Sequence, residues 1–120
     1  MLLMIKKELI AKCKLKDSLL LVIDGLTKNN YGIIFVYEED KFIGIITDGD
    51  IRRSLNRLKD KFYIYKAKDI MTKKFLTINQ NELATDALSI LEKNNISSLP
   101  VLNDENVVGL VRFHDLYEIR

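Results

Sequence analysis

The sequence of 120 residues has one cysteine, one proline and no tryptophan. With Cys13 alone, an internal disulfide framework and a zinc cluster built on cysteines are both excluded. No stretch approaches the roughly 20 apolar residues needed to cross a bilayer. The apolar start, residues 1–5, is too short for the core of a signal peptide and follows no basic region. Together with the single thiol, which fits a reducing compartment, these absences lead us to expect a cytoplasmic protein without a membrane segment.

The sequence also lacks a strong excess of one charge sign and the usual catalytic patterns. Lysine and arginine total 19 and aspartate and glutamate total 17, giving a net charge of +2. Both signs are mixed along the chain, whereas a nucleic-acid-binding protein shows a concentrated basic stripe. The sequence has no nucleophile with a plausible base, no phosphate-binding glycine-rich loop and no carboxylate pair with a defined role. We therefore expect no nucleic-acid partner and no catalytic residue in this chain, and no metal site, since His114 is the only histidine.

What the sequence does contain is an internal repeat. Gly44-Ile-Ile-Thr-Asp-Gly-Asp50 returns at a constant offset as Gly109-Leu-Val-Arg-Phe-His-Asp115. After a shift of two residues, the block 3–9 also resembles the block 70–76. Self-similarity on this scale indicates two related halves. We predict repeat one at residues 3–58, a connector at 59–68 and repeat two at 69–120.

Each repeat follows the order helix, strand, turn, strand, helix. In repeat one, Asp17 and Ser18 can cap a helix that continues to about Lys28, because its apolar residues fall at helical spacing. Strands at 33–37 and 42–47 and a helix at 48–58 complete this repeat. In repeat two, Asn79 is the predicted N-cap of a helix that ends at residues 94–95, followed by strands at 98–102 and 107–111 and a helix from about 113.

The predicted strands are continuous apolar runs, which are typical of strands covered on both faces. Neither repeat alone offers enough core. The predicted fold class is therefore α/β, with two pseudo-symmetric helix-strand-strand-helix repeats packed sheet to sheet and helices outside. The connector lacks glycine and proline, and we expect it to be ordered.

The motifs resemble those of the cystathionine β-synthase (CBS) domain, here as a tandem pair. The resemblance is carried by the two Gly…Asp strings, by Asp69-Ile-Met-Thr72 opening repeat two, and by Ser98-Leu-Pro-Val101 leading a strand. Thr47-Asp-Gly-Asp-Ile-Arg-Arg53, with the later His-Asp-Leu, is similar to CBS pairs fused to bacterial sugar-phosphate isomerases of the arabinose 5-phosphate isomerase type. CBS pairs of some sugar nucleotidyltransferases carry a similar string, so that alternative stays open, as does a stand-alone CBS protein.

In the CBS family a nucleotide lies in the cleft between the repeats, the threonine of the string contacts phosphate, and the aspartate takes ribose hydroxyls. Arg112 stands where repeat two departs from the threonine, and an arginine can fork onto a phosphate. The resemblance implies these candidate ligand-binding residues: Thr47, Asp50, Arg52, Ser98, Pro100, Arg112, His114 and Asp115. An ordinary structural role is the alternative at Thr47, as a helix cap, and at Asp50, which the helix dipole favours by roughly 0.3–1 kcal/mol.

The resemblance further implies a regulatory module rather than an enzyme. In the proteins it resembles, an isomerase domain precedes the CBS pair in the chain and acts in the synthesis of Kdo, lipopolysaccharide or capsule precursors. No cofactor is required, and the expected ligand is one adenine nucleotide or CMP-sugar per chain, since the half-sites are unequal. Two chains are expected to pair into a homodimer through their outer helices. The alternative from another class is an oligomerisation module with a vestigial cleft, for which the substituted threonine position is the evidence.

Overall fold

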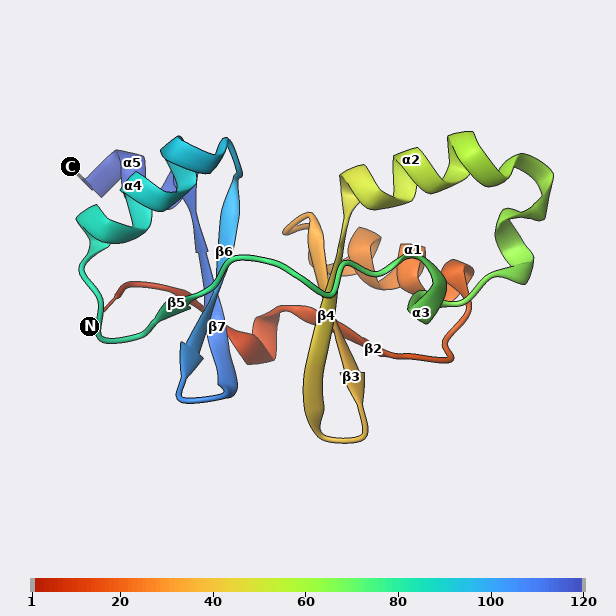
Figure 1. The fold of residues 1–120 in the computed structure, drawn as a ribbon, viewed down its shortest axis with the longest axis horizontal. Coiled ribbons are helices and arrows are strands. Elements are labelled where there is room, and N and C mark those ends of the chain that lie inside the picture. The colour runs from red at the N-terminus through yellow and green to blue at the C-terminus, as the bar shows by residue number, and fades with distance from the viewer. Residues whose placement is uncertain (1, 120) are drawn as a thin grey trace. The chain divides into compact units, whose positions relative to one another are not determined.

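The computed structural model describes residues 2–119, with side chains as far as Leu116. The chain forms two compact units, each with one small sheet and its own helices (Figure 1). Unit 1 contains Met1–Leu9 and Leu76–Arg120, and unit 2 contains Ile10–Phe75. Unit 1 is therefore discontinuous in sequence, and the first residues of the chain belong with the second repeat.

Unit 2 is built on a three-stranded sheet with the order β2-β3-β4. β3 (Ile33–Glu38) and β4 (Lys41–Thr47) form an antiparallel hairpin, and β2 (Ala11–Lys14) runs parallel to β3. The helical elements are α1 (Leu19–Asn29), α2 (Asp48–Leu58), the 3-10 segment η2 (Lys59–Ile64) and the short α3 (Ala67–Ile70). Ser18 begins α1 by accepting a hydrogen bond from the Leu21 amide, and Asn30 ends it in the left-handed conformation.

Unit 1 contains a four-stranded sheet with the order β1-β7-β6-β5. β6 (Ser98–Asn103) and β7 (Asn106–Arg112) form the antiparallel hairpin. β5 (Ile78–Asn79) runs parallel to β6, and β1 (Ile5–Lys6) pairs antiparallel with β7. The 3-10 turn η1 (Lys7–Leu9), α4 (Ala84–Asn94) and α5 (Phe113–Ile119) complete the unit.

Each unit has its own hydrophobic core on the helix-covered face of its sheet. In unit 2, Ile34, Val36 and Ile46 from the strands pack with Leu19 and Val22 of α1. The corresponding core of unit 1 gathers residues of α4, β6, β7 and α5, together with Leu2 and Ile78: these are Ala87, Leu88, Leu91, Leu99, Val101, Val111 and Leu116. Strand residues outside these two cores, including Ile33, Phe35 and Leu110, are buried as well. Both faces of the strands are therefore covered, which explains why their sequences are continuous apolar runs instead of simple alternations.

The opening segment of each repeat pairs with the last strand of the other repeat. Thr72 and Ile45 exchange two backbone hydrogen bonds, of 2.9 and 3.1 Å. In the other unit Ile5 pairs with Leu110 of β7 in the same register. These pairings follow the sequence match between residues 3–9 and 70–76, so the similarity of the two blocks has a structural cause.

The glycine of each repeated string makes room for that opening segment. A Cβ on Gly44 would lie 2.9 Å from the Met71 sulfur, and a Cβ on Gly109 would lie 2.6 Å from the Met4 sulfur. Such distances are shorter than real Cβ contacts, so only glycine fits without movement. The absence of a side chain at these glycines therefore allows a methionine, and the segment that carries it, to pack directly against the backbone of the repeated motif.

The predicted α/β class with two repeated halves is confirmed, and the four hairpin strands and the helices α1, α2 and α5 lie close to their predicted positions. The predicted N-cap of α4 is wrong. Asn79 belongs to β5 and its side chain accepts a hydrogen bond from the Asn81 amide, while the helix begins after Leu83. The connector is ordered as η2 followed by α3. The repeat boundaries 3–58, 59–68 and 69–120 stay a prediction, because the compact units follow contacts rather than sequence similarity.

Candidate ligand-binding half-sites

In repeat one the candidate residues lie where β4 passes into α2. Thr47 is the N-cap of α2, and its hydroxyl accepts a hydrogen bond of 3.2 Å from the Asp50 amide. The Asp50 carboxylate in turn accepts a bond of 2.9 Å from the Thr47 amide, which completes a capping box. Both side chains are half-buried. The predicted pair, Thr47 and Asp50, is thus brought together, and both side chains cap the N-terminus of α2, which is the structural alternative to ligand binding.

Arg53 is the residue at this half-site that the sequence did not assign to it. Its guanidinium reaches back to Asp50 Oδ1 at 2.7 Å, and the Arg53 side chain is 71% exposed while that of Asp50 is 13% exposed. Gly49 lies beneath it, since a Cβ there would be 3.1 Å from the guanidinium. The spacing of three residues on a helix was the available signal, because such residues are neighbours on the helix surface.

In repeat two the equivalent place holds an ion pair instead of a capping box. Arg112 donates from Nε and from a terminal nitrogen to both carboxylate oxygens of Asp115, each at 2.9 Å. Ser98 lies opposite Arg112 across the β6–β7 hairpin. Three of the predicted residues therefore meet at this end of the hairpin, and the arginine that replaces threonine is tied to the aspartate by a bidentate contact.

The charge state of Asp115 follows from these neighbours. The hydrogen bonds from Arg112 hold the pKa of the Asp115 carboxyl below its usual value. Desolvation by burial raises this pKa, while the charges of Arg112 and His114 lower it further, and the net shift is downward. Asp115 is therefore ionised at neutral pH. The half-site presents an anion and a cation in contact, so a polar ligand with both hydroxyl and phosphate groups would find a partner for each.

The remaining candidates lie further from these pairs. Pro100 is fully buried on β6, opposite Leu110, so its side chain is part of the packed interior. His114 is exposed on the first turn of α5. Arg52 is exposed on α2, and its side chain makes no hydrogen bond or ion pair with any described residue. It lies in an open surface hollow with Arg53, Leu55 and Asn56.

Within the described part of the chain, no three histidine, cysteine, aspartate or glutamate side chains are grouped so that they could hold a metal ion. None of the helices between residues 2 and 119 combines the length and apolar character that crossing a membrane requires.

The comparison with protein families finds the CBS domain twice, at residues 5–57 and 67–120. The chain belongs to the CBS domain family. The two matches correspond to the two repeats, and the structure shows that the repeated Gly…Asp strings of this CBS pair end at the N-termini of α2 and α5. The predicted identity of the tandem pair is therefore confirmed.

Relatives and solved structures agree with this assignment. The chain is 43% identical over 89 residues to a probable arabinose 5-phosphate isomerase of Haemophilus influenzae, covering 73% of this chain and 26% of that protein. The crystal structure of the CBS domain of NE2398 has a TM-score of 0.82 at 25% identity, covering 92% of this chain and 87% of that one. The CBS domain pair of protein MJ0100, solved with 5′-methylthioadenosine and S-adenosyl-L-methionine, has a TM-score of 0.76 at 27% identity over 92% of this chain and 86% of that one.

The chain spans between about a quarter and a third of the length of the curated relatives it matches. The shared part is the CBS pair. The isomerase activity of the relatives therefore belongs to those longer proteins.

Proposed function

We propose that this CBS pair is a regulatory module that binds one adenine-type nucleotide or nucleotide-sugar per chain and modulates an arabinose 5-phosphate isomerase domain fused to it. The proposal is supported by the similarity to curated arabinose 5-phosphate isomerases. It is also supported by the CBS pair of MJ0100, whose structure was solved with two adenosine-bearing ligands. The single observation that carries it is the retention of an aspartate, Asp50 or Asp115, at the same place in both repeats.

The chemistry of the half-sites fits the two ends of a nucleotide. A carboxylate accepts two hydrogen bonds from the vicinal hydroxyls of a ribose. An arginine beside it provides charge-assisted donors for a phosphate. Asp50 with Arg53 and Asp115 with Arg112 each offer this combination, with Thr47 and Ser98 beside them as hydroxyl groups. The ligand is expected to loosen the Arg53–Asp50 contact, because each side chain would give some of its hydrogen bonds to the ligand.

Regulation requires that the ligand favour one arrangement of the module over another. In the full-length protein that contains this chain, saturating nucleotide should change the rate of arabinose 5-phosphate isomerisation. The isolated chain should show no turnover of that sugar phosphate. A rate that is unchanged by every nucleotide that binds would contradict the regulatory part of the proposal.

Binding itself is tested by thermal shift with AMP, ATP, S-adenosylmethionine and CMP-linked sugars. A ligand at one hundred times its dissociation constant adds about 2.7 kcal/mol to the free energy of unfolding. Asp50→Asn and Asp115→Asn should reduce this shift. Neither variant is neutral for the fold, because both carboxylates make structural hydrogen bonds.

Asp69 offers a matched control for that structural effect. Its carboxylate accepts a 2.8 Å hydrogen bond from the Lys66 amide at the start of α3, the same type of bond that Asp50 makes at α2. Asp69→Asn should lower the stability of the free protein to a similar degree and leave the ligand-induced shift intact. Absence of a shift with every ligand would instead favour an oligomerisation module with an unused half-site.

A further inference from the structure

The connector between the two repeats carries a concentration of positive charge. Residues 59–68 contain four lysines and one acidic residue, whereas the whole chain has a net charge of only +2. All four lysines are exposed. None of them forms an ion pair with another residue that the structure describes, so their charge is available to a partner. Figure 1 shows this part of the chain as the green segment that leaves α2 and enters α3.

Two large apolar side chains are exposed within this positive segment. Tyr63 is 64% exposed and Ile64 is 63% exposed, at the end of η2. Phe62 beside them is 5% exposed and belongs to the core of unit 2. Phe62 therefore anchors η2 and leaves its two neighbours on the outside. Adjacent apolar side chains with a polar rim mark an interaction surface more often than scattered ones do.

The backbone holds the lysines around these two side chains. The Lys59 amide bonds back to the last turn of α2. Residues three positions apart lie on the same side of a 3-10 helix, which brings Lys61 beside Ile64. The Lys68 amide donates a 2.9 Å hydrogen bond to the Leu15 carbonyl oxygen, which ties the end of the connector to the loop before α1. We call the following residues the connector surface: Lys59, Lys61, Tyr63, Ile64, Lys66 and Lys68.

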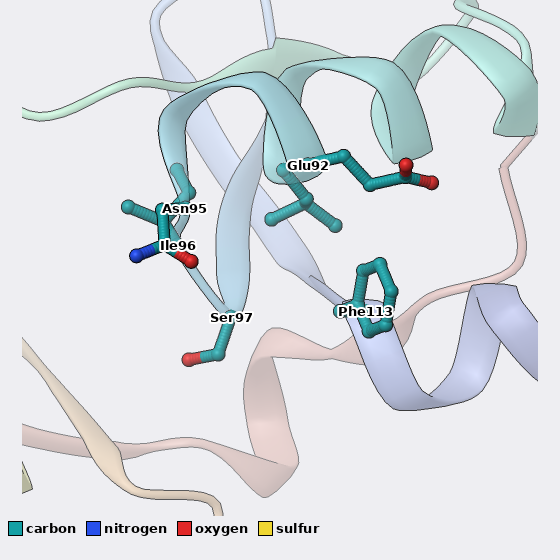
Figure 2. Close-up of a pocket in the computed structure, with 6 residues that line it drawn as sticks. Glu92, Asn95, Ile96, Ser97 and Phe113 are labelled. Atoms are coloured by element: carbon teal, nitrogen blue, oxygen red, sulfur yellow. The ribbon is translucent and has the colours of Figure 1, made fainter.

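The surface of unit 1 beside α4 has a different character. Figure 2 shows a hollow there, between the end of α4 and the start of α5, with Glu92 and Phe113 on its walls. Its six lining residues include one acidic side chain and no lysine. An anionic partner would therefore favour the connector surface of unit 2 over this hollow.

We propose that the connector surface binds the anionic headgroup region of a phospholipid bilayer, so that the protein lies on a membrane without crossing it. Lysines near a negatively charged bilayer are attracted to it, and their aliphatic stems can follow apolar surface while the ammonium groups stay in water. Tyr63 suits the headgroup level, where tyrosine rings are enriched, and Ile64 can enter the acyl boundary. This mode of binding needs no spanning segment, in agreement with the helices that the structure describes.

The composition of the connector surface favours a bilayer over other anionic partners. Lysine is depleted and arginine enriched where two proteins meet, whereas all four cations here are lysines. Proteins that bind single-stranded nucleic acid place flat rings against the bases, and Ile64 offers no such ring. A bilayer uses both features, since it takes up aliphatic side chains and attracts lysines without requiring a fixed geometry.

Vesicles provide the direct test. The anionic probe contains equal parts of phosphatidylcholine and phosphatidylglycerol, and the neutral probe is phosphatidylcholine alone. Tyr63→Trp supplies a fluorophore, because the chain has no tryptophan. Anionic vesicles should shift the emission of this variant to the blue in a saturable way, and brominated lipid should quench it. Neutral vesicles should bind far more weakly. Salt at 1 M should weaken the binding of anionic vesicles, because the screening length then falls to about 3 Å.

Matched variants separate the connector surface from net charge. Lys59→Gln combined with Lys61→Gln should weaken binding to anionic vesicles by about 25-fold, at about fivefold for each lysine. Lys6→Gln combined with Lys7→Gln removes the same charge from exposed positions of unit 1 and should have a smaller effect. Ile64→Ser should weaken binding by roughly tenfold. All five side chains are exposed, so each variant should keep the fold, which circular dichroism checks.

Four results would overturn the proposal. Equal weakening by the two lysine pairs, or binding that ignores Ile64→Ser, would show attraction to net charge alone. Binding of polyuridylic acid but not of vesicles would reassign the surface to nucleic acid. Self-association that Ile64→Ser abolishes, without vesicle binding, would reassign it to a second copy of the chain. Vesicle binding by this chain but not by the full-length protein that contains it would show that another domain covers the surface. None of these results depends on nucleotide binding, so the test is separate from that of the proposed function.

Discussion

Substitution of Gly109 by alanine is the sharpest test of how the first residues of the chain complete unit 1. The new Cβ would lie 2.5 Å from the Ile5 carbonyl oxygen and 2.6 Å from the Met4 sulfur. The Met4 side chain can turn away. The Ile5 oxygen is backbone of β1, which pairs with β7, so it can move only if the strand moves.

The magnitude follows from the cheaper of two responses. If β1 shifts but stays paired, the cost is that of overpacking a well-packed site, about 1–3 kcal/mol. If the segment leaves the sheet, Leu2, which is 4% exposed, and Met4 lose their packing. Full burial of a side chain such as Leu2 contributes about 1.5–3 kcal/mol, and the half-buried Met4 adds a smaller amount, so complete release costs more than a shift of the strand. We therefore expect Gly109→Ala to lower the free energy of unfolding by about 1–3 kcal/mol, the cost of the smaller response.

Urea unfolding followed by circular dichroism measures this change. Gly25→Ala is the control, because its Cβ would meet the end of the Ile34 side chain and Ala11 Cβ but no backbone atom. Alanine also favours a helix interior over glycine by about 1 kcal/mol, so this variant should stay within about 1 kcal/mol of the original chain. If Gly109→Ala is as stable as Gly25→Ala, the proposed seating of β1 against Gly109 is wrong.

Three other predictions concern single groups. Because the pKa of Asp115 is lowered in the folded state, its contribution to stability is present above the unfolded value near 3.8 and is lost as pH falls below it. The free energy of unfolding should therefore fall more steeply with decreasing pH below about pH 4 in the original chain than in Asp115→Asn. Burial raises the pKa of the Cys13 thiol to about 12, so a thiol reagent at pH 8 should react with it only after unfolding; rapid reaction of the folded chain would contradict its burial. Leu20 and Leu21 are 64% and 57% exposed on α1, and we expect Leu20→Lys to weaken the proposed homodimer; a sedimentation profile that is monomeric before the substitution would contradict the pairing.

The sequence predicted the elements whose signals are local. The cap at Ser18, the hairpin strands and the start of α2 at Thr47 each depend on residues within a few positions of one another. The short strands β1, β2 and β5 were not predicted, because a strand of two to four residues has too little pattern to be recognised and is defined by its partner. Asn79 was misassigned for the same reason.

The candidate site was predictable in part. Repetition singled out Asp50 and Asp115, and the structure shows what each contacts, including Arg53, whose role depends on the direction its flexible side chain takes. Ligand preference is likewise a property of side chains brought together by the fold.

We propose above that this CBS pair binds a nucleotide through Asp50 and Asp115. Isothermal titration of AMP into the original chain, into the double variant Asp50→Asn with Asp115→Asn, and into Asp69→Asn tests it most directly. We expect saturable binding of one nucleotide per chain, which is retained in Asp69→Asn and lost in the double variant while that variant remains folded by circular dichroism. Binding of AMP with undiminished affinity by the folded double variant would contradict it.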